Sequence, residues 1–591
     1  MNAPTLRRPL LVYLVALVPV MGLAAGFAPY MIDGDSVAYM DIADLLHAHR
    51  WADAVNGYWH PLYPALLSVA QGLVHPARAN ELGVYYAVNF VVFFAQVAAM
   101  LWFVTALVRL REAMGEAPAV LSLKALQMLG VALLVIAAQR ELTLNRVGPD
   151  GLLQALILAG LAMLLQALAT DRLIFAPLMG LFFGLAYLTK SFAFLLALLA
   201  IAVLVLFQWR AQRRPLLRAV TSGALALVVF AAVAGPYVAA LSRQKHRFDF
   251  GDSGSLNYAW YVGGTEKMHL EPWMTKDFGA ATATLVHPEK QLLAQPGIYS
   301  YKGHALGTYP AWFDATYFNE RIVPHIQLGQ LAKRDERNMV LVFRYLLNHP
   351  EPLILLALLL FAGARLRLRE TTFWWPAVGL GLAMWGIYGL VNVEERYVTV
   401  AYFAVLLPLF AALEVRAESE ARALLPASAL RSGAGMLVVL LAFLALGETL
   451  RVALRERREQ SVAGLAHGWQ YPEIFGAAEG LRAMGVRPGD EIACVGTKAC
   501  LDDHYWARLA GVQILTEMYE PSPKHLIDQL GALPNREQAY AVMRAQGAKV
   551  LVGYFDPDEM NAVHPAAAGW VRLGETAFYA LPLNLPGEAA R

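Results

Sequence analysis

Two carboxylates stand where the first apolar stretch of the sequence ends. Asp33 and Asp35 follow directly after the apolar residues 10–30. Carboxylates at the end of a membrane helix are costly unless a partner pairs with them or they reach the wet surface. One interpretation is a solvated cap at the membrane interface. The alternative is a general base, or a cation site, held at the membrane surface.

A third carboxylate, Asp150, follows Pro149 at the start of another apolar stretch, and Arg146 lies just before them. Proline is favoured in the first turn of a helix, and a carboxylate there interacts well with the helix dipole. A structural role therefore explains Asp150 when it is considered alone. A role in binding or catalysis stays open beside it.

Two cations occupy comparable positions. Lys190 lies between two apolar stretches with almost no loop around it, so it needs an anion, which could be a lipid headgroup or a bound phosphate. Arg396 lies at the edge of a later apolar stretch, next to Glu394 and Glu395. A plain ion pair is the simpler interpretation of Arg396, and phosphate binding is the other.

The composition shows which solvent surrounds these residues. Of the 591 residues, 58% are hydrophobic and 16% are charged, and the mean hydropathy is +0.45. Soluble domains carry about 25% charged residues. Lipid must therefore be the solvent for much of the surface. The net charge of +2 gives no basic field for nucleic acid, and two cysteines exclude a disulfide framework or a cysteine metal cluster.

Eleven stretches are long and apolar enough to predict membrane spans. They are 10–30, 84–108, 118–138, 150–170, 173–189, 192–209, 217–241, 351–366, 372–391, 397–415 and 433–453. The densest arginine clusters up to residue 431 fall in connections on one side, which predicts an inner N-terminus. The tail begins with arginines at 451, 455, 457 and 458, yet an odd number of spans places it outside. Long domains translocate largely regardless of charge.

The predicted fold class is mainly α: a polytopic transmembrane helical bundle with a C-terminal extracytoplasmic α/β domain. Residues 1–455 form the transmembrane domain, with outer loops 31–83 and 242–349. Residues 456–591 form the soluble domain. There, helical patterns at 471–484, 503–509 and 536–546 alternate with apolar strands at 491–495, 512–515 and 549–553.

This topology gathers the carboxylates Asp33, Asp35 and Asp150 on the same membrane face as Lys190 and Arg396. A reaction that deprotonates a hydroxyl and expels a lipid phosphate needs such a mixture of groups. Each residue by itself is weak evidence for a functional site. Their placement on the same membrane face is stronger evidence.

Four motifs resemble those of the polytopic C-type glycosyltransferase superfamily, and within it the protein O-mannosyltransferases and the lipid A aminoarabinose transferase. An acidic residue precedes a tyrosine by four positions, a Pro-Leu-Tyr element closes the first loop, Pro-Asp opens the fourth span, and a Gly-Leu-Ala-Tyr-Leu-Thr-Lys run follows. They are Asp35 to Tyr39, Pro61 to Tyr63, Pro149-Asp150 and Gly184 to Lys190, with a looser match at Glu395 to Tyr397. The likeness covers roughly residues 10–415.

The resemblance implies an inverting glycosyltransferase in a bacterial cytoplasmic (inner) membrane, with its site on the periplasmic face. It implies a polyprenyl-phosphate sugar donor, membrane lipids around the protein, and a glycan, lipid or protein hydroxyl as acceptor. Asp35 would be the general base, Asp150 would orient a substrate, and Lys190 and Arg396 would neutralise the departing phosphate. The remaining predicted substrate-binding residues are Asp33, Tyr39, His60, Tyr63 and Arg146. No cofactor is certain, and a divalent cation (Mg or Mn) on Asp33 and Asp35 stays open.

Three rival functions stay open: a lipid-linked glycan transporter or flippase, a glycan polymerase or ligase, and a non-catalytic scaffold. Against a transporter, most charges lie at span ends and the two halves show no repeat.

Two local features also allow two interpretations. Cys494 and Cys500 form a disulfide if the chain reverses at Gly496, and otherwise stay thiols. Trp260, Trp273 and Trp312 fit an interfacial belt slightly better than sugar stacking.

Overall fold

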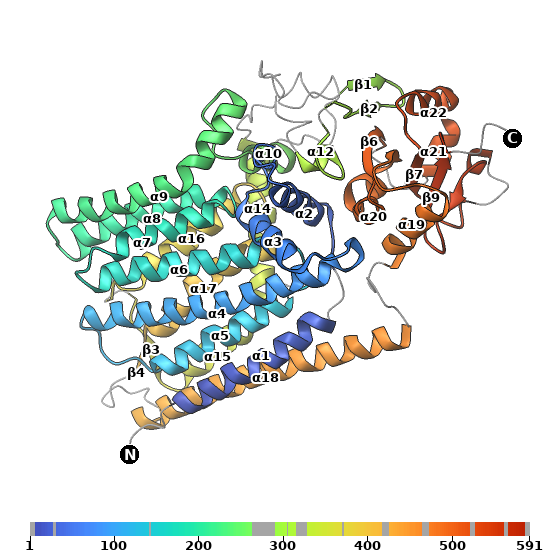
Figure 1. Ribbon diagram of the computed structural model, residues 1–591. Coiled ribbons are helices and arrows are strands. Elements are labelled where there is room, and N and C mark those ends of the chain that lie inside the picture. Colours follow the sequence, from blue (N-terminus) through green and yellow to red (C-terminus); the bar gives the residue numbers. More distant parts are fainter. Residues whose placement is uncertain are drawn as a thin grey trace.

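The apolar stretches form helices that lie side by side in one bundle (Figure 1). The computed structural model describes residues 6–27, 31–140, 144–262, 290–303, 305–314, 328–368, 371–415, 425–463, 472–520, 526–560 and 565–585. The bundle helices are α1 (Arg7–Phe27), α4 (Glu81–Ala113), α5 (Leu123–Arg140), α6 (Asp150–Ala169), α7 (Phe175–Tyr187), α8 (Phe192–Leu206), α9 (Leu216–Lys245), α15 (Glu351–Phe361), α16 (Trp375–Gly389), α17 (Glu395–Ala411) and α18 (Ala427–Ala463).

Each of the eleven predicted spans coincides with one of these helices. Within the described ranges, seven helices are long and apolar enough to cross a membrane: α1, α4, α5, α6, α8, α9 and α18. The ends of two predicted spans, 351–366 and 397–415, were wrong. Their last residues form β3 (Ala364–Leu366) and β4 (Leu413–Val415), a short antiparallel pair. Glu414 in β4 is buried and pairs with Arg111 at 3.4 Å.

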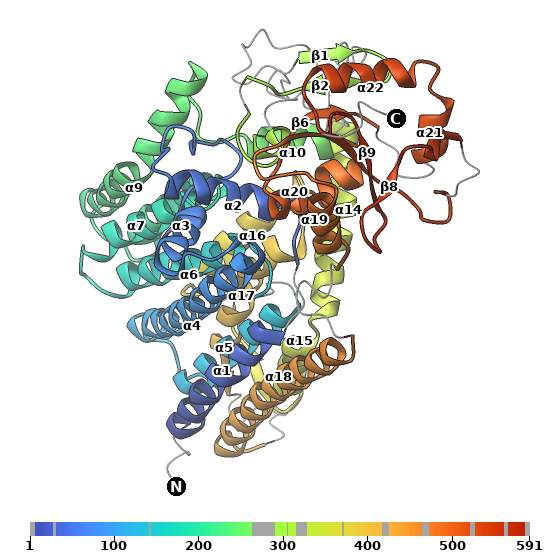
Figure 2. The same cartoon turned by 45° about the vertical axis from the view of Figure 1, so that its right-hand side comes forward.

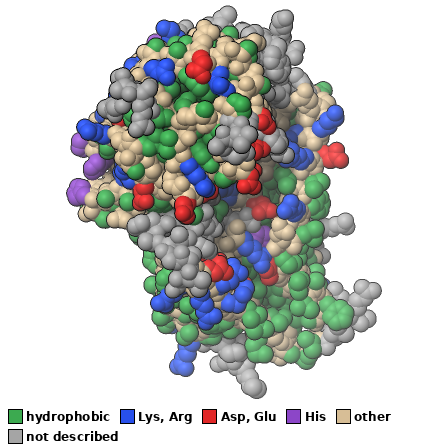
Figure 3. All heavy atoms as spheres, turned by 90° about the vertical axis from the view of Figure 1, so that its right-hand side faces the viewer, with side chains coloured by type: hydrophobic (Ala, Val, Ile, Leu, Met, Phe, Trp, Pro, Cys, Tyr) green, Lys and Arg blue, Asp and Glu red, His purple; other side chains and the backbone are tan. Residues whose placement is uncertain are grey.

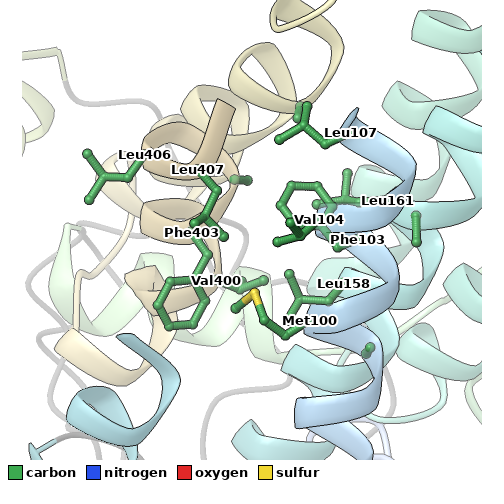
Figure 4. Close-up of a cluster of buried hydrophobic side chains, with 14 of the residues drawn as sticks. Met100, Phe103, Val104, Leu107, Leu158, Leu161, Val400, Phe403, Leu406 and Leu407 are labelled. Atoms are coloured by element: carbon green, nitrogen blue, oxygen red, sulfur yellow. The ribbon is translucent and has the colours of Figure 1, made fainter. Parts of the chain in front are cut away.

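The bundle is apolar both inside and outside. Met100, Phe103, Leu158 and Phe403 from α4, α6 and α17 lie in its core (Figure 4). Large apolar side chains are also exposed, as on α9, where Leu217 is 79% exposed. In water such an exterior would be unfavourable, whereas lipid tails match it.

The two ends of the bundle differ in what they contact. At the start of α4, Glu81 binds Arg508 of the C-terminal domain; near its other end, Arg111 binds Glu414 of β4. An α-helix of 33 residues is about 50 Å long. The C-terminal domain and β3–β4 therefore lie at opposite ends of the bundle (Figure 1).

Short helices from the outer loops gather at the end that carries the C-terminal domain (Figure 2). They are α2 (Gly34–His47), α3 (Leu62–Val74), η1 (Arg78–Asn80), α10 (Ser253–Tyr261) and α12 (Pro310–Phe313); α14 (Leu328–Asn348) leads from this region into the bundle. Figure 3 shows charged side chains scattered over the upper part of one face and mainly apolar ones over the lower part.

The C-terminal domain is built on a seven-stranded sheet of order β1-β2-β6-β5-β7-β9-β8. Its strands are β1 (Lys290–Leu293), β2 (Ile298–Ser300), β5 (Glu491–Val495), β6 (Gln513–Met518), β7 (Val550–Tyr554), β8 (Val571–Arg572) and β9 (Phe578–Pro582). Its helices are α19 (Pro472–Ala483), α20 (Tyr505–Ala510), α21 (Leu526–Ala532) and α22 (Arg536–Ala545). β5 is parallel to β6 and β7, as the alternation of helices and strands predicts.

One contribution to this sheet was not expected from the sequence. Strands β1 and β2 come from the loop 242–349, and β2 pairs antiparallel with β6. The second outer loop and the tail therefore share one sheet. That pairing ties the loop to the C-terminal domain.

Cys494 and Cys500 form a disulfide with their Cα atoms 5.6 Å apart. The chain reverses at Gly496, whose φ of +81° lies in the left-handed region that favours glycine. The reversal that the bond requires is therefore present. Both cysteines are fully buried.

The bond is open to a direct chemical test. Intact-mass spectrometry of the protein, denatured without reductant in the presence of an alkylating reagent, should show no alkyl group on Cys494 or Cys500. Prior reduction should add two alkyl groups. Alkylation of both cysteines without reductant would contradict the bond.

Candidate functional site

Six of the nine predicted site residues line one pocket at the outer-loop end of the bundle. They are Asp35, Tyr39, Arg146, Asp150, Lys190 and Arg396. The pocket has a volume of about 100 Å³. Its charged lining consists of three cations and two carboxylates. It therefore has the mixture of charges that the sequence predicts.

Asp35 lies in the first turn of α2. Asp33 caps this helix by accepting a hydrogen bond from the Ser36 backbone N–H at 2.9 Å. The Asp35 side chain is 31% exposed, and its Oδ2 lies 3.7 Å from Arg396. Burial, and then the neighbouring Asp33, raise the pKa of Asp35 to about 6, although Arg396 and Arg146 oppose the change.

A backbone hydrogen bond holds Arg146 close to the first loop. The Met31 backbone N–H donates to the Asn145 carbonyl at 3.1 Å, and Arg146 then pairs with Asp33. The Ser36 hydroxyl lies 2.9 Å from the Val147 carbonyl. The segment before α6 is thereby attached to the start of α2.

Asp150 is the first residue of α6, as the sequence predicts. Its Oδ1 accepts a hydrogen bond from Lys190 at 2.5 Å, so the anion that Lys190 needs is a carboxylate of the same chain. Its Oδ2 lies 3.7 Å from Arg396. Arg396 also binds Glu394 at 2.7 Å, so the predicted plain ion pair and a place in the pocket are both present.

Tyr63 lies outside the pocket lining and contacts residues next to it. Its hydroxyl accepts a hydrogen bond from the Gly148 backbone N–H at 3.1 Å and donates to Asn89 at 2.8 Å. Its ring packs edge-on against Tyr39, with the ring centroids 5.7 Å apart. Tyr63 thus fixes the backbone that leads to Asp150 without lining the pocket.

His60 is not brought to the pocket. Its ring is buried against Tyr187 and Tyr237, at centroid distances of 5.0 and 5.4 Å. Burial lowers the pKa of His60 to about 4, so the ring is neutral at pH 7. Its position supports a packing role instead of the predicted contact with a substrate.

The interfacial-belt interpretation was wrong for Trp260 and Trp312, and Trp273 lies outside the described residues. Both rings are only 7% exposed and stack with centroids 6.0 Å apart. The Trp312 indole N–H donates to Asp35 Oδ1 at 3.3 Å. Trp312 therefore belongs to the surroundings of the carboxylate.

Several residues that line the pocket were not predicted as site residues from the sequence, namely Tyr58, Trp59, Asn257, Tyr388 and Tyr397. Tyr397 carried a signal, because it follows Arg396 in the looser motif, and Lys190 Nζ lies 4.3 Å from its ring centroid. Asn257 carried none, since the loop around it shows no periodicity.

An apolar cavity of about 310 Å³ adjoins the charged pocket. The two share Ser191, Phe192, Ser253, Asn257, Tyr388 and Tyr397 as lining residues. The remainder of the cavity is lined by Leu195, Phe250, Gly251, Gly254, Ser255, Ile387, Val391 and Asn392. The charged pocket therefore adjoins a mainly apolar space that could hold hydrocarbon.

Asp33 and Asp35 do not fit a divalent cation. Arg146 pairs with Asp33, and Arg396 and the Trp312 N–H face Asp35. In the described part of the chain, no group of three or more His, Cys, Asp or Glu side chains is arranged to hold a metal ion. Mg²⁺ prefers near-octahedral oxygen ligands, which these residues do not supply.

The chain is an integral membrane protein, and its fold is similar to that of a C-type polytopic membrane glycosyltransferase of known structure. It is similar to ArnT, the lipid A aminoarabinose transferase, from Cupriavidus metallidurans. The crystal structure of that protein bound to undecaprenyl phosphate matches 98% of each chain, with 12% sequence identity and a TM-score of 0.51. The apo structure is 13% identical, with a TM-score of 0.51 over 96% of this chain and 97% of that one.

A weaker likeness is to the structure of the oligosaccharyltransferase of Archaeoglobus fulgidus, tethered with an acceptor peptide. That match has 12% sequence identity and a TM-score of 0.42, and it covers 92% of this chain and 69% of that one. No protein-family model and no curated protein matches the sequence. The likeness to ArnT confirms the predicted fold class, a helical membrane bundle with a C-terminal α/β domain.

Proposed function

We propose that this protein is an inverting glycosyltransferase that moves a sugar from a polyprenyl-phosphate-linked donor to a hydroxyl of a glycan, lipid or protein acceptor. One observation supports this above the others. A partly exposed carboxylate, Asp35, shares a pocket with Arg146, Lys190 and Arg396, and an apolar cavity adjoins that pocket.

The donor suits the two connected spaces. Its phosphate would lie against Lys190 and Arg396, whose charges stabilise an oxygen that becomes more negative as the sugar leaves. The first isoprene units would lie in the cavity lined by Leu195, Phe250 and Ile387. ArnT of Cupriavidus metallidurans, the similar structure, holds undecaprenyl phosphate.

Asp35 would act as the general base. Its carboxylate takes the proton of the acceptor hydroxyl, and that oxygen attacks the anomeric carbon of the sugar. The bond from this carbon to the phosphate oxygen breaks, and the electron pair leaves with the polyprenyl phosphate. A single displacement inverts the anomeric centre. The Trp312 N–H and Arg396 would orient the carboxylate, while Asp150 would orient Lys190 and Arg396.

Two features support a location in a bacterial cytoplasmic membrane with the pocket on the periplasmic side. The Cys494–Cys500 disulfide fits an oxidising compartment. Arg111 and Arg367 lie with Glu414 at the end of the bundle away from the pocket, which agrees with the rule that positive connections stay inside.

The substitution Asp35→Asn tests the proposed base. It keeps the size of the side chain but removes the proton acceptor, so turnover of a polyprenyl-phosphate sugar by the purified protein should fall by about 10²-fold or more. The matched control is Asp53→Asn, which breaks only an exposed pair with Arg50. Near-normal transfer by a folded Asp35→Asn protein would remove Asp35 from the mechanism.

The pH dependence of transfer follows from the raised pKa of Asp35. The base must be ionised to accept a proton, so kcat/KM should fall as the pH drops through about 6. Above this pH range kcat/KM should reach its full value, because the Asp35 carboxylate is then charged. A kcat/KM that stays level down to pH 4 would contradict the assignment.

Lys190→Met tests the donor phosphate contact. The change removes one cation while Arg396 stays beside Asp150, so donor affinity should weaken by about tenfold and acceptor affinity should change little. Binding of a short polyprenyl phosphate measures the first quantity. Lys302→Met is the control, because Lys302 pairs at the surface with Glu491. Equal losses for donor and acceptor would favour a purely structural lysine.

A further inference from the structure

Arg508 of the C-terminal domain is buried among carboxylates that belong to the outer-loop end of the bundle. Its side chain is 2% exposed. It donates to Asp41 at 2.6 Å, to Asp44 at 2.8 and 3.1 Å, and to Glu81 at 2.8 and 2.9 Å. Asp41 and Asp44 lie on α2, the helix that carries Asp35 in its first turn. Glu81 is the first residue of α4.

A second contact joins α2 to the segment that carries Trp312. Thr308 donates to Asp41 through its backbone N–H at 2.6 Å and through its hydroxyl at 2.9 Å. The Thr308 carbonyl accepts from the Ile514 backbone N–H of β6 at 2.9 Å. Asp41 thus binds both Arg508 and the segment that leads to the indole beside Asp35.

A third contact lies directly next to the base. A Cβ atom added to Gly34 would stand 2.7 Å from the backbone oxygen of Leu501, and 3.0 Å from the Trp312 ring. Leu501 follows Cys500, whose disulfide attaches this stretch to β5. The C-terminal domain therefore packs against the residue immediately before Asp35, and only glycine leaves room for it.

We propose that Arg508 is a positioning residue for sugar transfer, because through α2 and the Thr308–Trp312 segment it sets where the Asp35 carboxylate lies. Asp41 is six residues from Asp35, about 9 Å along the same helix. A rigid helix of that length carries a displacement at one end to the other. Simple docking of the domain does not need this network, since apolar residues can replace a buried ion network without loss of stability.

This inference rests on the proposed role of Asp35 as general base. The charged groups that act on Asp35 are Asp33, Arg146, Glu394 and Arg396, and Asp150 lines the same pocket. Arg508 binds a different set of carboxylates. A variant at position 508 therefore changes the surroundings of Asp35 through position and burial, while those five side chains stay.

The experiment uses the full-length protein in detergent or nanodiscs. Arg508→Met alone would leave Asp41 and Glu81 buried and charged, which would disfavour folding. The main variant is therefore Arg508→Met with Asp41→Asn and Glu81→Gln. Asp44 keeps Arg78 as its partner at 2.7 Å in that variant. Arg544→Met is the matched control, since Arg544 lies on the same domain and donates only to the Leu583 carbonyl at 2.9 Å among its described hydrogen bonds.

In the triple variant, kcat should fall by about 10-fold to 10²-fold, the scale of a small misplacement of a catalytic group. The KM for the donor should stay within about twofold, because Lys190, in the connection between α7 and α8, and Arg396, on α17, belong to the bundle. Water admitted to Asp35 should move the acidic limb of kcat/KM to lower pH, since burial is what raises that pKa. Hydrogen exchange at the α2 amides should become faster than in the Arg544→Met control.

Two further single variants complete the test. Arg508→Lys should recover part of kcat, because an ammonium can pair with some of the three carboxylates. Gly34→Ala leaves every charge in place and should lower kcat without raising the donor KM.

A folded triple variant with wild-type kcat and an unmoved acidic limb would overturn the inference. An equal loss in kcat and donor affinity with unchanged α2 exchange would overturn it as well. Failure of the proposed function looks different, because the unmodified protein would then transfer no sugar at all.

Discussion

The pairing of Asp150 with Lys190 and Arg396 governs the outer end of this protein. A cation between two lipid-embedded helices is unfavourable unless an anion meets it, and Asp150 supplies that anion to Lys190 at 2.5 Å. Because Arg396 lies 3.7 Å from both Asp150 and Asp35, the same network reaches the first outer loop. Charge thus holds α6, α17, the α7–α8 connection and the first loop together at a single point.

The network can hold position and still leave groups for a ligand, because its three cations line the pocket. Arg146, Lys190 and Arg396 are lining residues, and the Asp35 side chain is partly exposed. An entering phosphate therefore finds donors that are already ordered, which lowers the reorganisation needed in the transition state. With the apolar cavity beside it, the pocket fits the proposed donor, which has a charged head and a hydrocarbon tail.

The sequence predicted those features that composition and local pattern determine. Apolar length identified every bundle helix, and alternating patterns identified three strands and three helices of the C-terminal domain. Charge at span ends identified Asp35, Asp150, Lys190 and Arg396, because lipid penalises unpaired charge wherever it occurs. These signals are local, so one sequence is enough to read them.

Contacts between distant segments could not be predicted in this way. Strand β2 joins β6 across more than 200 residues, and nothing in the loop 242–349 marks that pairing. His60 was selected by its neighbourhood in the sequence, yet the tertiary fold turns it toward Tyr187 and Tyr237. The belt interpretation of Trp312 failed for the same reason, since its packing against Trp59 of the first loop is invisible in its local pattern.

Burial by the C-terminal domain also explains why Asp35, the proposed base, is surrounded by so much protein. Asp35 lies in a short helix of an outer loop, which by itself would be mobile and wet. Trp312 and the Leu501 backbone cover the start of this helix, and Arg508 binds its middle. The covering raises the pKa of Asp35, which makes the carboxylate a stronger base than an exposed aspartate. None of the side chains described for the α/β domain lines the pocket. In the proposed chemistry this domain would still contribute, because it limits the solvent around Asp35 and, through α2, would set the direction in which the carboxylate points.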